Sequence, residues 1–183
     1  SELRQSKLLL NTIAEDLAEE GVPHRRDIPI GMMVEVPAAV LMLDRFVKEV
    51  DFLSIGTNDL VQYTLAVDRS NECVADLYQS SDPAVLRLIR RCVDVAAEAK
   101  VPLSICGEMS STPARSLLLV GMGVRSLSVS PNALPKLKKA IRSVSLAQCE
   151  EIAARAMTLE AARDIDLYLL ERLGKIAPEL IVS

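Results

Sequence analysis

Three short apolar runs of this sequence end in side chains that could do chemistry. Glu35 lies in "MMVEVPAA", Asn58 and Asp59 follow "DFLSIGT", and Cys106 ends "VPLSIC". A carboxylate in an apolar run is costly to bury unless it is paired or binds a cation. Glu35 and Asp59 together offer the hard oxygen ligands that Mg²⁺ or Mn²⁺ prefers, so we expect a divalent metal site. Either carboxylate taken alone is equally well explained by a helix cap or an arginine partner.

Arg69 and Cys106 extend this set. Arg69 stands ten residues past Asp59 in "TLAVDRSN", and a guanidinium near a metal suits recognition of a phosphate or carboxylate. A surface ion pair with Asp68 is the alternative. Cys106 has three interpretations: a small buried side chain, a metal ligand, or a thiol with a chemical task. The expected hard-donor metal argues against the second of these.

The other three cysteines, Cys73, Cys92 and Cys149, fall in helical or loop segments away from the expected strand ends. We interpret them as packing thiols. The four cysteines show no paired spacing such as C-x-x-C. They therefore indicate reduced thiols of a cytoplasmic protein.

Four apolar runs, each about the length of a buried strand, predict the elements that position these residues. They span residues 30–36, 51–56, 102–106 and 124–130. Helical patterns lie between them, and this alternation predicts a parallel sheet with crossover helices. Ligand sites lie at the carboxyl ends of such strands, so the polar groups there should converge. A doubly wound sheet and half of a (β/α)₈ barrel both fit.

Helix signals complete a single domain over residues 1–183. The expected N-caps are Asp82 before Pro83, Thr112 before Pro113, and Ser145 in a capping box with Gln148. We expect a helix and loop over residues 1–29, βα units with the site over residues 30–143, and one C-terminal helix within residues 144–183. Pro37 opens a further predicted helix over residues 37–49.

Composition limits the function classes. The chain has 183 residues, with 21 Lys and Arg against 25 Asp and Glu and a net charge of −4. This balance argues against a nucleic-acid partner and a basic membrane face. No apolar run approaches the length that spans a bilayer, so no membrane insertion is expected. The sequence begins without Met inside a helical pattern, and we expect it to be a piece of a longer protein.

The motifs resemble one family. From about Ile30 to Ile141, the chain resembles the C-terminal, phosphoenolpyruvate (PEP)-binding domain of enzyme I of the bacterial sugar phosphotransferase system. The similar segments are "GMMVEVPAAVLML", "VDFLSIGTNDLVQYTLAVDRSN", "DPAVLRLI" and "LSICGEMS". "GTNDL" and "CGEM" are shared with pyruvate phosphate dikinase and PEP synthase, whereas "QYTLAVDR" favours enzyme I. The resemblance implies a (β/α)₈ barrel, of which about four βα units here form the C-terminal half, followed by a C-terminal helix.

The resemblance also implies roles for particular residues. Glu35 and Asp59 match Mg²⁺ ligands, with Mn²⁺ a possible substitute. Asn58, Asp59 and Arg69 match substrate-binding positions, and Cys106 matches the acid that protonates C3 of the enolate. A thiol suits that task because it is mostly protonated at neutral pH. Three neighbours are expected to support these groups: Gly56, Thr57 and Glu108.

The activity implied is transfer of phosphate from PEP to a histidine on a separate N-terminal domain and then to the carrier protein HPr. Pyruvate is released, and the phosphate transfer drives sugar uptake. The implied enzyme is a homodimer in the bacterial cytoplasm. This chain alone is expected to be inactive, since that domain and the first half of the barrel lie outside it. Ser110 and Ser111 stand where the family usually has Ala and Gly.

Alternatives remain. The chain could belong to a pyruvate phosphate dikinase, a PEP synthase or a nitrogen-type paralogue. It could also serve as an oligomerisation module without chemistry of its own.

Overall fold

A four-stranded parallel sheet organises the computed structural model, which describes residues 2–181. Its strands are β1 (Gly31–Val34), β2 (Phe52–Gly56), β3 (Leu103–Cys106) and β4 (Ser126–Leu127). They lie in sequence order, and each neighbouring pair is parallel. The four predicted strands and their parallel arrangement are confirmed, although β4 is only 2 residues long.

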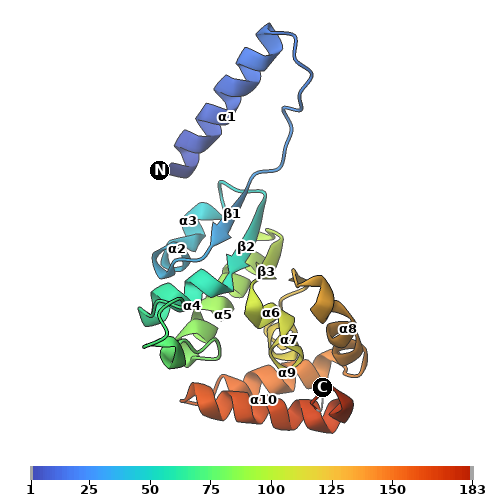
Figure 1. Ribbon diagram of the computed structural model, residues 1–183. Helices are drawn as coiled ribbons and strands as arrows, with labels where there is room; N and C mark the ends of the chain where they lie inside the picture. The colour runs from blue at the N-terminus through green and yellow to red at the C-terminus, as the bar shows by residue number, and fades with distance from the viewer. Residues whose placement is uncertain (1, 182–183) are drawn as a thin grey trace.

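Helices follow or separate these strands, as Figure 1 shows. They are α1 (Glu2–Glu19), α2 (Pro37–Leu41), α3 (Leu43–Phe46), α4 (Thr57–Leu65), α5 (Pro83–Ala99), α6 (Glu108–Ser111), α7 (Pro113–Gly121), α8 (Leu134–Arg142), α9 (Leu146–Ala156) and α10 (Ala162–Ile176). Short 3₁₀ turns are η1 (Ala75–Leu77), η2 (Pro131–Ala133) and η3 (Pro178–Leu180). In the view of Figure 1, α1 stands apart at the top and α10 lies at the opposite end.

The core lies on one face of the sheet. Leu53, Ile55 and Ile105, at alternate positions of their strands, face the helices and are fully buried. Because side chains of a strand alternate between faces, the intervening residues point the other way. On that second face Met33 is 46% exposed and Phe52 is 41% exposed. Within residues 2–181, helices therefore cover only one face of the sheet.

Helix α1 makes few contacts with this core. None of its described side chains is buried, and its Leu8 is 66% exposed and its Leu9 61% exposed. The helix is tied at its start, where Lys7 Nζ donates to the backbone oxygen of Glu49 at 2.8 Å and Arg4 pairs with the Glu49 carboxylate. An apolar stripe thus runs along α1 without a covering partner in the described part of the chain.

The C-terminal segment corrects one prediction. The expected single helix is two helices, α9 and α10, separated by residues 157–161. The capping box of Ser145 and Gln148 that begins α9 is confirmed. No glycine or proline marks the break. Its cause is packing: the turn folds α10 back so that both helices bury apolar residues beside α7.

Close approach of α7 and α9 depends on Gly121. A Cβ at this position would collide with the backbone oxygen of Cys149 and lie 2.9 Å from the Cβ of Ala153. A glycine at the end of α7 therefore lets α9 pack directly against it.

Three local predictions also need correction. The helix predicted over residues 37–49 is divided at Met42 into α2 and α3. Helix α4, which begins directly after β2, was not expected. Thr112 does not cap α7: its hydroxyl instead donates to the backbone oxygen of Glu108 at 3.5 Å. The Asp82 cap of α5 is confirmed, since its carboxylate accepts from the Ala84 amide at 2.8 Å.

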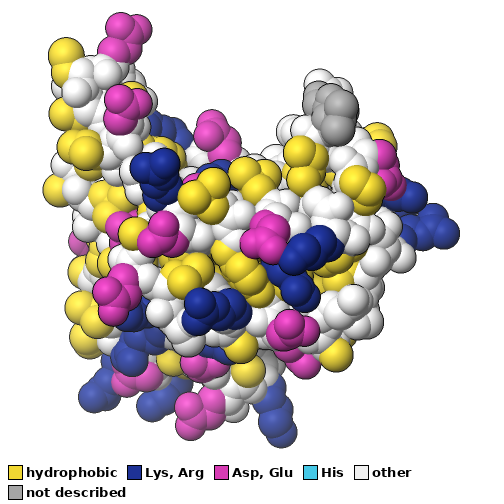
Figure 2. Space-filling model, turned by 90° about the horizontal axis from the view of Figure 1, so that it is seen from below, with side chains coloured by type: hydrophobic (Ala, Val, Ile, Leu, Met, Phe, Trp, Pro, Cys, Tyr) yellow, Lys and Arg dark blue, Asp and Glu magenta, His cyan; other side chains and the backbone are white. Residues whose placement is uncertain are grey.

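Charges of both signs are interspersed on the face seen in Figure 2, which agrees with the small net charge. Across residues 2–181, no helix combines the length and apolar character needed to cross a bilayer.

Candidate functional site

The sheet brings most of the predicted site residues to one edge. Glu35 directly follows β1, Asn58 and Asp59 lie in the first turn of α4 immediately after β2, and Cys106 is the last residue of β3. In the strand register Cys106 is the partner of Gly56. Because the three strands are parallel, their carboxyl ends meet at this edge.

Gly56 makes room for the Glu35 carboxylate. A Cβ on Gly56 would lie 2.7 Å from Glu35 Oε2 and 3.1 Å from Glu35 Cβ. Any larger residue would therefore displace Glu35. Glu35 and Asp59 are both partly buried, and neither takes part in an ion pair within residues 2–181.

These two carboxylates fit a magnesium ion in donor chemistry. Among the described residues, no cluster of three or more His, Cys, Asp or Glu side chains is present. Mg²⁺ is commonly held by one or two carboxylates and completes its shell with water and substrate phosphate. Two carboxylates that follow neighbouring strands, Glu35 and Asp59, would fit such a partial shell.

The turn that follows Cys106 is bound to α4 by two hydrogen bonds. Asn58 Oδ1 accepts from the Glu108 amide at 3.0 Å, and Thr57 Oγ1 donates to the backbone oxygen of Cys106 at 2.8 Å. Between them, Gly107 has φ of 110°, where a Cβ would collide with Thr57 Oγ1. Glycine is required here by both conformation and space. The expected supporting residues Gly56, Thr57 and Glu108 thus adjoin the site.

The Cys106 thiol is partly buried at the strand end. Its sulfur donates to the backbone oxygen of Ile55 at 3.5 Å, and the Ser54 hydroxyl lies 3.9 Å from it. The sulfur thus lies within hydrogen-bonding distance of a backbone carbonyl at the end of the neighbouring strand. Sequence reasoning missed Ser54, although the alternation within β2 places it on the same face as Gly56.

A cavity of about 400 Å³ opens beside the thiol, lined by Asn58, the turn 106–108, Ser111 and residues 128–130. Ser110 joins two of the lining segments, because its fully buried hydroxyl contacts the backbone oxygens of Gly107 and Ser128, each at 2.7 Å. The Ser130 amide donates to Ser111 Oγ at 3.4 Å. Ser110 and Ser111 therefore link the turn after Cys106 to residues 128–130.

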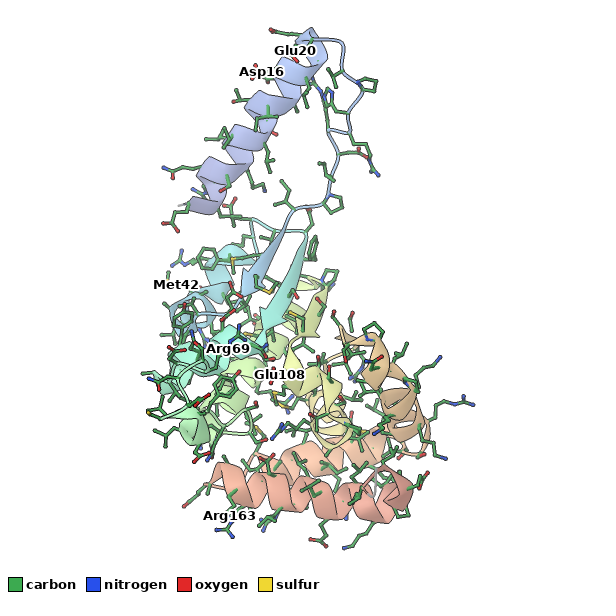
Figure 3. The ribbon with its side chains drawn as sticks, in the orientation of Figure 1. Asp16, Glu20, Met42, Arg69, Glu108 and Arg163 are labelled. Atoms are coloured by element: carbon green, nitrogen blue, oxygen red, sulfur yellow. The ribbon has the colours of Figure 1, made fainter. Side chains whose placement is uncertain are left out.

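Arg69 and Glu108 lie near the centre of the molecule in Figure 3. Arg69 is exposed, and its amide donates to Gln62 Oε1 at 3.2 Å. Arg69 does not line the cavity beside Cys106. The expected alternative, an ion pair with Asp68, is absent within residues 2–181.

Tyr78 is a further residue of this region that sequence reasoning missed. Its hydroxyl donates to the backbone oxygen of Asn58 at 3.0 Å. Burial raises the pKa of Tyr78, the Glu108 and Asp59 carboxylates raise it further, and the Arg69 guanidinium lowers it. The phenol therefore lies among the charged groups of the site. The turn "LYQSSDP" that carries it contains no motif that predicts this.

The remaining cysteines divide into two groups. Cys92 and Cys149 are buried, which confirms their interpretation as packing thiols. Burial raises the pKa of Cys92 to about 12 and also raises that of Cys149. For Cys73 the interpretation is wrong: it is exposed, because the loop between α4 and η1 runs over the surface.

Comparisons with known proteins identify the family. Residues 1–146 match the family model described as PEP-utilising enzyme, PEP-binding domain. The chain is 39% identical over 170 residues to a phosphoenolpyruvate-protein phosphotransferase of Buchnera aphidicola subsp. Acyrthosiphon pisum, which covers 93% of this chain and 30% of the relative. It is also 40% identical over 170 residues to the protein of the same name from Haemophilus influenzae. That match covers 93% of this chain and 30% of the relative.

The protein of the same name from Enterococcus faecalis is 40% identical over 156 residues, which covers 85% of this chain and 27% of the relative. The chain thus spans about 30% of the length of the curated relatives it matches. The family model covers most of the chain, including every strand of the sheet. By this match over residues 1–146, the chain belongs to the PEP-utilising enzymes.

Proposed function

We propose that this chain is the PEP-binding, magnesium-dependent part of a phosphoenolpyruvate-protein phosphotransferase of the bacterial cytoplasm. The full enzyme transfers phosphate from PEP to its own histidine on another domain and then to HPr, and it releases pyruvate. The observation that carries the proposal is the meeting of Glu35, Asn58 and Cys106 at the carboxyl ends of three parallel strands. The names of the relatives support this activity over that of a dikinase or synthase.

The proposal extends to the fold. The four βα units form the C-terminal half of a (β/α)₈ barrel, and the missing strands would cover the second face of the sheet. The exposure of Met33 and Phe52 on that face supports this arrangement, since the corresponding face of a closed barrel is a packed interior. The coverage of about 30% of each relative also supports it.

In this proposal the side chains bind and orient PEP. Glu35 and Asp59 hold the metal, which when bound supplies positive charge to the phosphate and enolate oxygens. Asn58, whose side-chain oxygen accepts from the Glu108 amide, contacts PEP in this proposal. Arg69, which has no ion-pair partner in residues 2–181, can place its guanidinium on the phosphate or carboxylate of PEP.

Cys106 completes the reaction. Departure of the phosphoryl group breaks the bridging P–O bond and leaves the enolate of pyruvate, while the phosphorus forms a bond to the acceptor histidine. The thiol then gives its proton to C3 of the enolate, which yields pyruvate and leaves a thiolate that regains a proton from water. The position of the thiol beside the cavity supports this role.

A hybrid enzyme tests the proposal. Residues 1–183 replace the segment they match in the Haemophilus influenzae relative, and pyruvate release is measured with PEP, Mg²⁺ and HPr. We expect HPr-dependent turnover. Cys106→Ala should lower kcat by about 10²-fold or more, as expected for loss of a general acid, while PEP binding is retained. Cys73→Ala, at the exposed cysteine, is the matched control and should leave turnover unchanged.

Two results would contradict the proposal. A correctly folded hybrid that releases no pyruvate would remove its support. Loss of PEP binding in Cys106→Ala equal to the loss of turnover would exclude the acid role, because the residue would then act in binding.

A further inference from the structure

The segment between α4 and α5 carries a tyrosine that the proposed reaction does not use. Tyr78 directly follows η1 and is partly buried. Its hydroxyl donates to the backbone oxygen of Asn58 at 3.0 Å. A carbonyl has two lone pairs, so it can accept this bond together with a helical one. Tyr78 therefore holds the first turn of α4, which also carries Asp59.

The first turn of α4 is hydrogen-bonded to the residues around the Cys106 thiol. The Asn58 side chain accepts from the Glu108 amide at 3.0 Å, and Thr57 donates to the backbone oxygen of Cys106 at 2.8 Å. A shift of the turn would strain or break both bonds. The position of Cys106 thus depends on the position of α4, which Tyr78 helps to fix.

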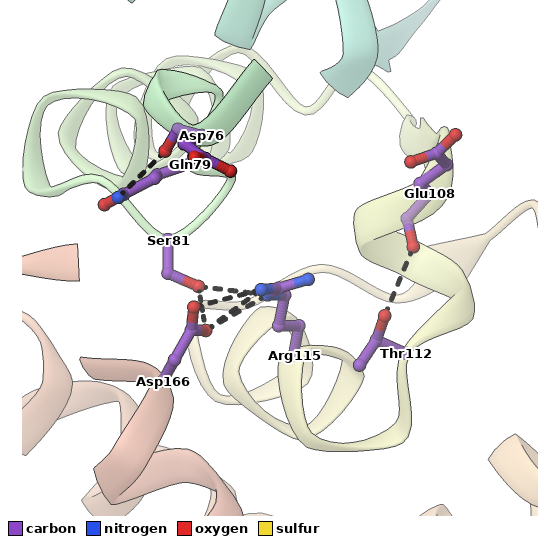
Figure 4. Close-up of polar contacts among 7 residues, drawn as sticks. All are labelled: Asp76, Gln79, Ser81, Glu108, Thr112, Arg115 and Asp166. Atoms are coloured by element: carbon purple, nitrogen blue, oxygen red, sulfur yellow. Dashed lines mark hydrogen bonds and ion pairs between the residues drawn. The ribbon is translucent and has the colours of Figure 1, made fainter. Parts of the chain in front are cut away.

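The segment that carries Tyr78 is also anchored at Ser81, whose contacts Figure 4 shows. Ser81 is fully buried, and its hydroxyl donates to Asp166 Oδ1 at 2.6 Å. Arg115 Nε donates to Ser81 Oγ at 3.0 Å, and the Arg115 guanidinium pairs with the Asp166 carboxylate at 3.1 Å. Three residues beyond Tyr78, the segment is therefore bonded to both α7 and α10.

The charges around the phenol agree with a donating hydroxyl. Burial raises the pKa of Tyr78, and the nearby carboxylates of Glu108 and Asp59 add to this, while Arg69 opposes it. The phenol remains protonated at neutral pH and keeps its hydrogen for the Asn58 carbonyl.

We propose that Tyr78 is a positioning residue: its hydroxyl fixes the first turn of α4 and, through Asn58 and Thr57, the orientation of the Cys106 thiol beside the cavity. In this role it touches neither PEP nor metal. The importance of that orientation for turnover rests on the proposed function, whereas the mechanical link from Tyr78 to Cys106 does not.

Alkylation of the 183-residue chain by iodoacetamide tests the link without PEP. Peptide mass spectrometry gives a separate rate for each cysteine. In Tyr78→Phe, which deletes only the hydroxyl, we expect the rate at Cys106 to rise about threefold to tenfold, because one hydrogen bond is lost. The rate at exposed Cys73 should not change. Tyr63→Phe, on α4 at a side chain that is 56% exposed, is the matched control.

A double-mutant cycle separates positioning from general loosening. In an Asn58→Ala background the bond to the Glu108 amide is already absent, so Tyr78→Phe should change the Cys106 rate by much less than in the wild type. Full multiplicativity of the two effects would overturn the proposal. An unchanged Cys106 rate in a folded Tyr78→Phe protein would overturn it as well.

A second variant protects the test against unfolding of the first. Ser81→Ala keeps the phenol but removes the hydroxyl that anchors its segment, and it should raise the Cys106 rate in the same direction. If Tyr78→Phe fails to fold, an unchanged rate in folded Ser81→Ala overturns the proposal.

Kinetics of the hybrid enzyme supply a readout that a purely structural role would not move. Tyr78→Phe should lower kcat about threefold to tenfold, and KM for PEP should change by less than kcat. A rise in KM alone would make Tyr78 a substrate contact and overturn the proposal. A changed Cys106 rate in a folded hybrid that has no activity would contradict the proposed function but support the link.

Discussion

At the scale of single residues, two glycines decide where the chemical groups of the site can lie. Gly56 leaves the space that the Glu35 carboxylate occupies, and Gly107 lets the turn after Cys106 pass against Thr57. Only the second has a positive φ, at 110°. Gly56 therefore serves by its size alone, which makes it the cleaner position for a mutation.

Gly56→Ala should weaken metal binding and also lower the stability of the fold. Its Cβ would lie 2.7 Å from Glu35 Oε2, so the carboxylate must move. We expect Mn²⁺ affinity, measured by electron paramagnetic resonance on the 183-residue chain or the hybrid, to fall about tenfold. The free energy of unfolding should fall by about 1–3 kcal/mol.

Gly31→Ala is the control for this substitution. It lies on the neighbouring strand of the same sheet, where the new Cβ would displace the partly exposed Phe52 ring and leave Glu35 in place. Equal losses of Mn²⁺ affinity in the two variants would show that Glu35 is not the group affected.

Residue types and spacing predicted the groups that converge at the strand ends, because a parallel sheet places all its carboxyl ends at one edge. Glu35, Asn58, Asp59 and Cys106 were found in this way. Tyr78 could not be, because it reaches Asn58 from a loop 20 residues further along the chain. Contacts of that kind depend on the path of a loop, which no periodic pattern encodes.

At the scale of elements, the strands were easier to predict than the ends of the helices. Each buried strand is a continuous apolar run, so its place is visible in the sequence. The break between α9 and α10 has no glycine or proline, and only the burial of residues such as Ile152 and Ile165 beside α7 explains it. The sequence contains the apolar residues but not the direction in which they fold back.

Helix α10 is held to the rest of the fold by the cluster of Ser81, Arg115 and Asp166. Asp166→Ala should lower the free energy of unfolding by about 1–3 kcal/mol, because the fully buried Ser81 hydroxyl loses its acceptor and Arg115 loses its partner. Urea denaturation followed by circular dichroism measures this change.

Glu171→Ala is the control for the cluster. It removes an exposed ion pair with Lys175 within the same helix and should change the unfolding free energy by less than about 0.5 kcal/mol. If both variants lose the same unfolding free energy, the cluster stabilises α10 no more than a solvated surface ion pair does.

At the scale of the whole molecule, the distribution of apolar side chains is uneven. One face of the sheet is covered by helices, while the other exposes Met33 and Phe52, and α1 exposes Leu8 and Leu9. Contiguous exposed apolar surface indicates a missing partner. In the proposed enzyme that partner is the first half of the barrel. In the isolated chain, another contact has to cover this apolar surface.

The isolated 183-residue chain should therefore associate with itself. Light scattering coupled to size exclusion should give a mass above the 19.9 kDa of one chain. Replacing Met33 and Phe52 together by lysine should shift the mass toward that of one chain, because the side chains are already half exposed and the charges would repel a second sheet face. A Leu8→Lys, Leu9→Lys variant tests the surface of α1 separately. A monodisperse monomer in the unmodified chain would contradict the prediction, since both apolar surfaces would then be stable in water.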